Sequence, residues 1–484
     1  MTAPASLLDR SPLDAPGVGL PLVALRRRAR ERWIPSRYNA RTVHDDGRLV
    51  LWNTWTGAVS VFPAAQREAV ERLLARAGVD DAATGLPHYL AERGFLVRAE
   101  VDELRRLRTA FGQEQYRTDI LELILLASED CNFRCTYCYE DFLRGTMRPE
   151  VREGIRRLVA LRAPTLRTLG VAWFGGEPLY GWEAVEELSP YFMAMAEEYD
   201  LAYSAAMTTN GYLLTPERQE RLLAWGVRNY QITVDGTAET HDRMRVARDG
   251  SPTWHRIMDN LEALHARPED YGVRLRVNYD QSNVHAIDAL LDIVRARFEA
   301  DPRFRVSLHA VGRWGGANDA NLPVCGTEQR REVRARLRTR ARELGLAMGG
   351  GVVEHHGAIH GTGVCYAARP FNFIVGATGT LMKCTVALDK HDYNIVGRLT
   401  PEGELELDGD KLAVWTEPAF ERDATCQHCH VGPICQGMAC PMVRIETGER
   451  SCLDVKSNLR RDLLETVERY ADAARAVPLA ATAP

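Results

Sequence analysis

Three cysteines in one short loop constrain this chain most strongly. Cys131, Cys135 and Cys138 have a C-x3-C-x2-C spacing and follow directly on an apolar run of strand length and type, Leu121 to Ser128. A [4Fe–4S] cluster has four irons, so three thiolates on one loop leave one iron without a protein ligand. Such an iron can bind a small molecule and pass it an electron. A loop at the end of a strand is also where α/β barrels place their chemistry.

A zinc knuckle and disulfide-linked cysteines are the alternatives for this loop. Structural zinc normally takes four ligands in paired C-x2-C sets, and no histidine or fourth cysteine is near. The chain holds eleven cysteines in 484 residues, most of them clustered. Clustered thiols in a long chain without a secreted, disulfide-dense pattern indicate metal or redox chemistry in a reducing compartment, so we expect a cytoplasmic protein.

With Tyr137 before its last cysteine, the loop resembles the signature of the radical S-adenosylmethionine (radical SAM) family. This resemblance implies that the open iron is chelated by the amino and carboxylate groups of S-adenosylmethionine. It also implies an electron transfer that yields a 5′-deoxyadenosyl radical, which abstracts hydrogen from unactivated C–H bonds. A flavodoxin or ferredoxin reductant is implied by the family in the same way.

The first hundred residues are expected to form a flexible lead-in and a small module. Residues 1–32 lack the charged start and apolar core of a signal peptide. In residues 33–100, strand-like runs at 36–44, 48–53 and 58–62 precede two helices. This order resembles the winged-helix-like element with which peptide-modifying enzymes recognise a precursor, where the third strand pairs with a leader peptide. The alternative is a stabilising cap on the barrel; residues 101–116 are expected to be a linking helix.

Alternating strand-like and helix-like stretches in residues 117–347 predict parallel βα units, and the family resemblance implies a partial (β/α)6 barrel. Three further segments match the family at the ends of predicted strands. By resemblance, Gly175, Gly176 and Glu177 hold the amino group of S-adenosylmethionine, and Asn210 lies beside the nucleoside. In the third segment, Thr233 is expected on the ribose side and Arg245 on the carboxylate, which suits a guanidinium.

Catalytic candidates follow from the same barrel. Asp235 is expected to face the reaction chamber and to position substrate or ribose hydroxyls. Asn278, His309 and Arg313 end two later strands and would line the barrel mouth; for His309 a packed histidine is the alternative. Cys325 is expected to be a buried, inert thiol, with a role as cluster ligand or proton donor as the other interpretation.

A Gly- and His-rich stretch at 348–363 marks a change of domain, and a second set of cysteines follows within residues 348–457. It resembles the SPASM extension, which carries two auxiliary iron–sulfur clusters, expected here to be [4Fe–4S]. The family's interleaved pattern assigns one cluster to Cys426, Cys429, Cys435 and Cys452, and the other, one ligand short, to Cys365, Cys384 and Cys440. Zinc is the alternative, since 426–435 also holds histidines. Residues 458–484 are expected to be a C-terminal helix and tail.

These features predict a radical SAM/SPASM maturase that oxidatively modifies a ribosomal precursor peptide, by a thioether or a C–C or C–O crosslink. A three-cysteine auxiliary cluster could bind a substrate thiolate, which would favour the thioether. The rivals are a sulfatase-type maturase acting on Cys or Ser of a protein, and a non-catalytic metal-binding adaptor. The net charge of −5 gives no basic field for nucleic acid, and no apolar stretch of 18 residues suggests a membrane span.

Overall fold

The computed structural model describes residues 32–75, 78, 79, 82, 84–142, 144–348, 364–388 and 390–476. The predicted lead-in 1–32 lies almost wholly outside these residues, as does all but Met348 of the Gly- and His-rich stretch. Within the described part of the chain, no helix has both the length and the apolar character that crossing a membrane would require.

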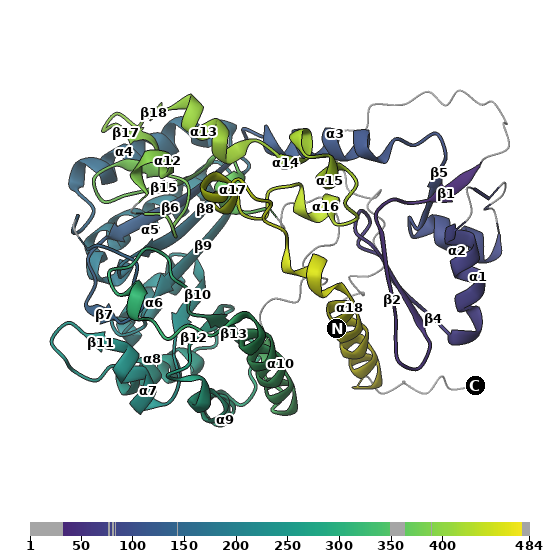
Figure 1. Ribbon diagram of the computed structural model, residues 1–484. Helices are drawn as coiled ribbons and strands as arrows, with labels where there is room; N and C mark the ends of the chain where they lie inside the picture. Colours follow the sequence, from purple (N-terminus) through teal and green to yellow (C-terminus); the bar gives the residue numbers. More distant parts are fainter. Residues whose placement is uncertain are drawn as a thin grey trace, which may run out of the picture.

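Six parallel strands, each followed by helical structure, form the centre of the fold (Figure 1), as the sequence predicts. Neighbouring strands in the sheet follow the chain order throughout this part. The strands are β6 (Ile120–Ser128), β8 (Thr168–Gly175), β9 (Ala202–Thr209), β10 (Val227–Thr233), β12 (Gly272–Tyr279) and β13 (Phe304–Ala310). The main helices are α4 (Pro149–Arg162), α5 (Trp182–Glu198), α6 (Pro216–Ala224), α8 (Trp254–His265), α9 (Ile287–Phe298) and α10 (Thr327–Glu343).

Alternation along each strand separates an apolar face from a polar one. In β12, Val273, Leu275 and Val277 are buried in the main core, whereas Arg274 and Arg276 on the opposite face keep some exposure. Burying each such aliphatic side chain stabilises the fold by about 1.5–3 kcal/mol. Because side chains alternate along a strand, burial of this apolar set directs the other set toward the interior of the barrel.

The sheet continues beyond the six predicted strands, to a total of eleven. At one edge β14 (Ala347–Met348) extends β13, and at the other β15 (Asn372–Val375) pairs parallel with β6. Antiparallel strands β16 (Thr380–Met382), β17 (Ile395–Leu399) and β18 (Leu405–Leu407) complete this edge. The sequence predicts a domain boundary at 347/348, whereas in the structure the cysteine-rich region begins as part of the barrel sheet. Strand pairing covers the open edge of β6, which would otherwise expose unpaired main-chain groups.

The N-terminal module has the predicted strands and helices. Its antiparallel sheet has the order β2 (Asn39–Val43), β3 (Leu49–Asn53), β4 (Val59–Phe62), and two helices follow, α1 (Ala64–Ala75) and α2 (Gly85–Glu92). Strands β1 (Trp33–Pro35) and β5 (Leu96–Arg98) pair beside this sheet. One face of the three-stranded sheet packs on the two helices through Leu51, Val70 and Phe95.

The other face of the module packs on the C-terminal part of the chain. Val50 and Trp52 lie in a buried cluster with Ile434, Val455 and Leu463. The last two belong to α18 (Asp454–Ala476), which starts four residues before the predicted boundary and lies between the module and α10 (Figure 1). The linking helix α3 (Glu103–Gln115) packs there too, with the rings of Phe111 and Phe420 edge to face at 5.2 Å. The module is thus joined to the C-terminal region by a shared apolar core.

Candidate active site

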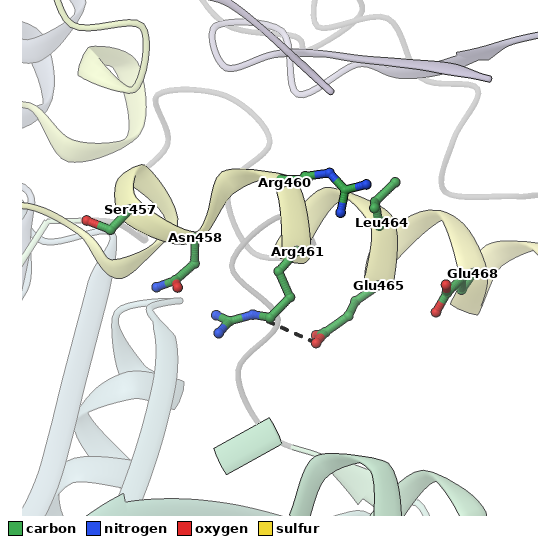
Figure 2. A pocket seen from close by; sticks show the side chains of 7 residues that line it. All are labelled: Ser457, Asn458, Arg460, Arg461, Leu464, Glu465 and Glu468. Carbon is green, nitrogen blue, oxygen red and sulfur yellow. Dashed lines mark ion pairs between the residues drawn. The ribbon is translucent and has the colours of Figure 1, made fainter. Parts of the chain in front are cut away.

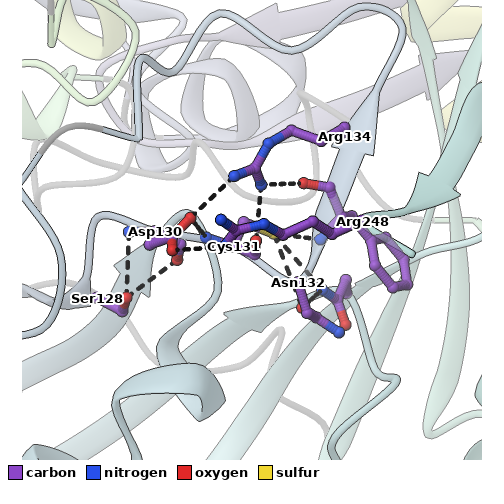
Figure 3. A network of polar contacts seen from close by, with 8 residues as sticks. Ser128, Asp130, Cys131, Asn132, Arg134 and Arg248 are labelled. Carbon is purple, nitrogen blue, oxygen red and sulfur yellow. Dashed lines mark hydrogen bonds and ion pairs between the residues drawn. The ribbon is translucent and has the colours of Figure 1, made fainter. Parts of the chain in front are cut away.

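The cysteine loop leaves the carboxyl end of β6 and is tied down at both of its ends. Asp130 accepts hydrogen bonds from the Cys131 main-chain N–H (2.8 Å), from Arg134 (3.1 Å) and from Arg248 (3.1 Å), as Figure 3 shows. These charge-assisted contacts fix the loop at Cys131. Further along, the short strand β7 (Phe133–Cys135) pairs antiparallel with β11 (Arg245–Ala247), which places Arg245 directly opposite Cys135.

Two glycines at the end of β8 pack against this loop. Gly175 has a φ of +118°, and a Cβ there would lie 2.1 Å from the carbonyl oxygen of Ser128. A Cβ on Gly176 would lie 2.7 Å from the Asp130 carbonyl oxygen and 3.1 Å from the Cβ of Cys131. Only glycine lets the two loops approach this closely.

Glu177 joins the ends of β8 and β9. Its carboxylate is fully buried and accepts hydrogen bonds from the Leu179 N–H (3.0 Å), the Thr209 hydroxyl (2.7 Å) and the Asn210 N–H (2.7 Å). Burial raises the pKa of this carboxyl, and the hydrogen bonds act in the opposite direction. An ionised carboxylate can accept about four hydrogen bonds, so three contacts inside the protein leave room for one further donor.

Asn210 connects the same loops to the cysteines. Its side-chain amide donates to the Oδ1 of Asn132 (2.8 Å) and lies 3.8 Å from the Cys131 sulfur. The Nδ2 of Asn132 is buried with no hydrogen-bond partner. A buried amide N–H without a partner is costly, which indicates a place for a polar ligand beside Cys131.

Tyr137, Asp235 and Arg245 form one buried polar network. The Tyr137 hydroxyl donates to Asp235 Oδ2 and accepts from Arg245 (2.8 Å) and from the Asn278 side-chain amide (3.1 Å). The other oxygen of Asp235 accepts from the Asn278 N–H (2.7 Å). Asp235 is predicted to face the reaction chamber, but in the structure it is fully buried and both its oxygens accept hydrogen bonds, from Tyr137 and from Asn278, so it positions Tyr137.

The electrostatics of this network leave Arg245 charged. Burial acts to lower its pKa, but Cys135, Tyr137 and Asp235 outweigh burial and raise the pKa well above its ordinary value. The Nε of Arg245 is buried without a hydrogen-bond partner. A guanidinium with one donor engaged and another unpaired can bind a planar anion such as a carboxylate.

Two residues between Thr233 and Arg245, His241 and Asp242, have positioning roles that the sequence did not reveal. The Nδ1 of His241 accepts a hydrogen bond from the Asp235 N–H (3.1 Å), and burial lowers the pKa of this imidazole well below its ordinary value. Asp242 accepts from the N–H groups of Thr253 and Trp254, both at 2.8 Å, at the start of α8. His241 and Asp242 therefore order the segment that follows β10.

The remaining barrel candidates differ in their placement. Thr233 is buried opposite Arg276 in the β10–β12 pair. His309 is half-buried beside the Ser307 hydroxyl (2.9 Å). Arg313 is exposed and donates to loop carbonyls at Asp319 and Leu322, so it stabilises a loop and does not line the interior as expected. Cys325 is buried in the main core, where burial raises the pKa of its thiol.

With the geometry described, comparison with known proteins decides the class of the barrel. Residues 125–275 match the family described as the radical SAM superfamily. These residues form a radical SAM domain. Radical SAM proteins are a superfamily of enzymes, and such a domain implies a [4Fe–4S] cluster and S-adenosylmethionine.

Two curated relatives match part of this chain in sequence, and a solved structure shares its fold. The radical SAM cyclopropyl synthase TigE of Paramaledivibacter caminithermalis is 24% identical over 197 residues, covering 36% of this chain and 39% of that protein. GTP 3′,8-cyclase of a Cyanothece species is 32% identical over 154 residues, covering 31% and 44%. The matches thus span less than half the length of these relatives. Native anSMEcpe with bound AdoMet and Cp18Cys peptide shares the fold, with a TM-score of 0.54, 16% identity and coverage of 74% of this chain and 99% of that one.

The residues present fit the cluster and the cofactor that a radical SAM domain implies. Cys135 acts electrostatically on both Cys131 and Cys138, and burial raises the pKa of each of the three thiols, to about 12 for Cys138. Metal binding to such thiols must displace their protons. The unpartnered Arg245 Nε and Asn132 Nδ2 lie next to these thiols and suit the carboxylate and the polar groups of S-adenosylmethionine.

Four of the seven C-terminal cysteines gather around one pocket. Cys426, Cys429, Cys435 and Cys452 line it together with Arg444, Arg450 and Lys456. Three of these thiols act on the pKa of Cys426, after burial and Asp423, and the ammonium of Lys456 lies 3.6 Å from the Cys452 sulfur. Three basic side chains beside four thiols suit an anionic metal–thiolate group.

The other three C-terminal cysteines form a separate group. The pKa of Cys365 is raised to about 11 by burial and by Cys384 and Cys440. Asn394 holds the Cys384 loop through both the N–H (2.8 Å) and the carbonyl (3.0 Å) of that residue. Cys384 and Cys440 thus act on Cys365, and Cys429, Cys435 and Cys452 act on Cys426. Neither Asn394 nor the adjacent buried Lys383, which donates to two carbonyls at 2.5 Å, was singled out from the sequence.

The two histidines between Cys426 and Cys435, His428 and His430, do not line the four-cysteine pocket. His428 Nδ1 lies 2.8 Å from the carbonyl oxygen of Ala424, its own helix neighbour. Among the residues that the structure describes, no three His, Cys, Asp or Glu side chains are close enough together to hold a single metal ion.

A further pocket follows the start of α18 (Figure 2), where the helix is kinked at Asn458. Arg461 and Glu465, one turn apart on α18, pair at 3.9 Å, and Glu465 also pairs with Arg338 of α10 at 3.4 Å. Arg460 pairs with Asp45 of the N-terminal module at 2.6 Å. Ion pairs at this pocket therefore connect α18 to the module and to the barrel.

Proposed function

We propose that this chain is a radical SAM maturase with two auxiliary iron–sulfur clusters that oxidatively modifies a ribosomally synthesised precursor peptide. The observation that carries the proposal is the convergence of the cysteine loop, the Gly175–Glu177 turn, Asn210 and Arg245 on one site at the carboxyl ends of the strands. Cys131, Cys135 and Cys138 would hold the cluster, and Arg245 would bind the cofactor carboxylate. When bound, the pair supplies a 5′-deoxyadenosyl radical that can take a hydrogen atom from an unactivated C–H bond.

The residues around this site would orient the cofactor and keep water out. Tyr137, which lies between Cys135 and Cys138 in the sequence, has three hydrogen-bond partners that fix its hydroxyl. Glu177 has capacity for one further donor, which suits the cofactor ammonium. Thr233 and Asn210, both buried, would lie on the nucleoside side.

The two C-terminal cysteine sets would hold the auxiliary clusters, which carry away the electron released when a substrate radical is oxidised. Their separation into a set of four and a set of three supports this assignment. The bond formed stays open between a thioether and a C–C or C–O crosslink. A thioether through the three-cysteine set requires a cysteine in the precursor, and turnover of a cysteine-free precursor would exclude it. The electron donor would be a flavodoxin or ferredoxin, and a cytoplasmic location suits these partners.

The N-terminal sheet would recognise the precursor. The N–H of Asn53 donates to the Ala58 carbonyl, and antiparallel pairs alternate, so Ser60 directs its main-chain groups toward β3 while Val59 and Val61 direct theirs away. Among the described residues, β4 pairs only with β3. Its outer edge can therefore accept an added strand.

Deletion of the whole module is a poor test of this role, because it would expose the apolar cluster around Val455 and Leu463. Val61→Pro removes one outward N–H and leaves the pairing with β3 intact. We expect Val61→Pro to weaken leader-dependent modification of a precursor encoded beside this protein by about tenfold, with Val61→Thr as the matched control. Modification is read as loss of two hydrogen masses from the peptide. Full activity of Val61→Pro on the leader-bearing precursor would contradict precursor recognition at this edge.

A further inference from the structure

The interior of the barrel carries basic side chains on β12 and β13 at the same face as the candidate site. Arg276 Nε donates to Asn278 Oδ1 (2.9 Å), and the amide of Asn278 donates to the Tyr137 hydroxyl. Across the strand pair, Arg276 stands opposite Ser307 and Asn278 opposite His309. Arg276 is therefore two hydrogen bonds away from the cysteine loop.

Arg274 and Arg276 of β12 lack the acidic partners that other barrel arginines have. Elsewhere in the barrel, Arg303 pairs with Asp301 (2.7 Å), and Arg267 with Glu269 (2.9 Å). In the part of the chain that the structure describes, neither Arg274 nor Arg276 forms an ion pair with a carboxylate, and Arg276 donates its hydrogen bond to an amide oxygen.

The positive charge of these arginines acts on His309. Burial, together with Arg276, Arg334 and Arg274, lowers the pKa of His309 to about 4. Burial also lowers the pKa of Arg276, partly offset by Tyr137, Tyr139 and Asp235. Arg276 is partly buried, forms no ion pair with a carboxylate and is only partly compensated for its lost hydration, so an anion beside it would be bound strongly.

We propose that Arg274, Arg276 and His309 form a subsite for a carboxylate of the substrate, which places an acidic residue of the peptide beside the residue that loses hydrogen. The inference rests on the proposed function, because it names the substrate chemistry of that same site. Guanidinium groups bind carboxylates with paired, directional hydrogen bonds, which suits positioning of a peptide. The carboxylate could come from an Asp or Glu side chain or from a peptide C-terminus.

Binding of short probe peptides to the reconstituted enzyme with S-adenosylmethionine tests the subsite. The probes are acetyl-Gly-Gly-Asp-Gly-Gly-amide, its Asn analogue, and acetyl-pentaglycine with a free C-terminus, with affinities measured by calorimetry. We expect the wild-type protein to bind the Asp probe about tenfold more tightly than the Asn probe. Arg276→Gln should remove most of this preference, and Arg274→Gln gives a second, more exposed variant. Arg243→Gln, an exposed arginine paired with Glu239 on the outside, is the matched control.

The outcomes separate the subsite from other sources of the effect. Tighter binding of the free C-terminus than of the Asp probe assigns the subsite to a peptide end. Equal or undetectable binding of the Asp and Asn probes overturns the subsite. Loss of S-adenosylmethionine affinity in Arg276→Gln, with the Asp preference retained, also overturns it, because the arginine would then serve the cofactor. Deoxyadenosine formation is measured on the same sample, so failure of the proposed function is seen independently of probe binding.

Discussion

Arg245 stands directly opposite Cys135 in the antiparallel pair of β7 and β11, and its guanidinium donates to the Tyr137 hydroxyl at 2.8 Å. Main-chain pairing thus sets the distance between a buried cation and the cysteine loop, and a side-chain hydrogen bond sets its direction. The cation remains charged because Cys135, Tyr137 and Asp235 outweigh the effect of burial on its pKa. This relationship puts an anion-binding group beside the thiols before any cofactor arrives.

Substitution of Gly176 by alanine should disturb the cysteine loop. The added methyl would lie 2.7 Å from the Asp130 carbonyl oxygen and 3.1 Å from the Cys131 Cβ, so the loop must shift. Misplacement by about 1 Å at a reacting centre can cost on the order of 10²-fold in rate, and we expect a loss of that order in deoxyadenosine formation. Gly112→Ala in α3 is the control, since no atom outside its own helical backbone lies within 4 Å of its added Cβ. Equal rates for Gly176→Ala and Gly112→Ala would show that the close packing is unimportant.

Iron content should separate the cysteines into independent sets. With three [4Fe–4S] clusters the protein binds about twelve irons. Cys435→Ala and Cys384→Ala should each lose about four, and the double variant about eight, since distant sites add. Cys429→Ala combined with Cys435→Ala should lose no more iron than either alone. A double variant within one set that loses twice as much as each single variant would refute the assignment, as would zinc bound in place of iron.

His309 should make the protein less stable in mild acid. Its folded pKa is about 4 and its ordinary value is 6.5, so between these values the unfolded chain binds a proton that the folded protein does not. The free energy of unfolding therefore falls as pH drops from 6.5 toward 4, by up to about 3 kcal/mol for this residue. We expect wild-type melting temperature to fall between pH 7 and pH 5 by roughly 2 °C more than that of His309→Gln. Identical falls in the two proteins would mean that the histidine is not held neutral.

Much of the barrel was readable from the sequence, because each strand pairs an apolar face with turn residues at its end. The run from Leu121 to Ser128 lies in β6, and the helix predicted after Pro63 is α1, which begins at Ala64. Buried strands of this kind are specified locally, by alternation and by Gly or Asn at the ends. Gly175 and Gly176 were singled out from the sequence as cofactor contacts, whereas their close packing against the cysteine loop is seen only in the structure.

Long-range relationships were not readable. The pairing of β7 with β11 joins three-residue segments too short to show periodicity, and β15 to β18 are short strands whose place at the edge of β6 depends on tertiary packing. The Asp235 carboxylate was expected in the chamber because its partners Tyr137 and Asn278 lie far away in sequence. Asn394, which holds Cys384, has no local signature at all.

The most direct test of the account is deoxyadenosine formation by protein reconstituted anaerobically with iron and sulfide, then reduced with S-adenosylmethionine present. The account predicts deoxyadenosine from the wild-type protein and none from Cys135→Ala. Arg245→Gln should need roughly tenfold to hundredfold more S-adenosylmethionine, the range expected for loss of a charge-assisted contact, while Arg243→Gln should behave as wild type. Iron-loaded wild-type protein that forms no deoxyadenosine, or a Cys135→Ala variant that forms as much as wild type, would contradict the assignment of the site.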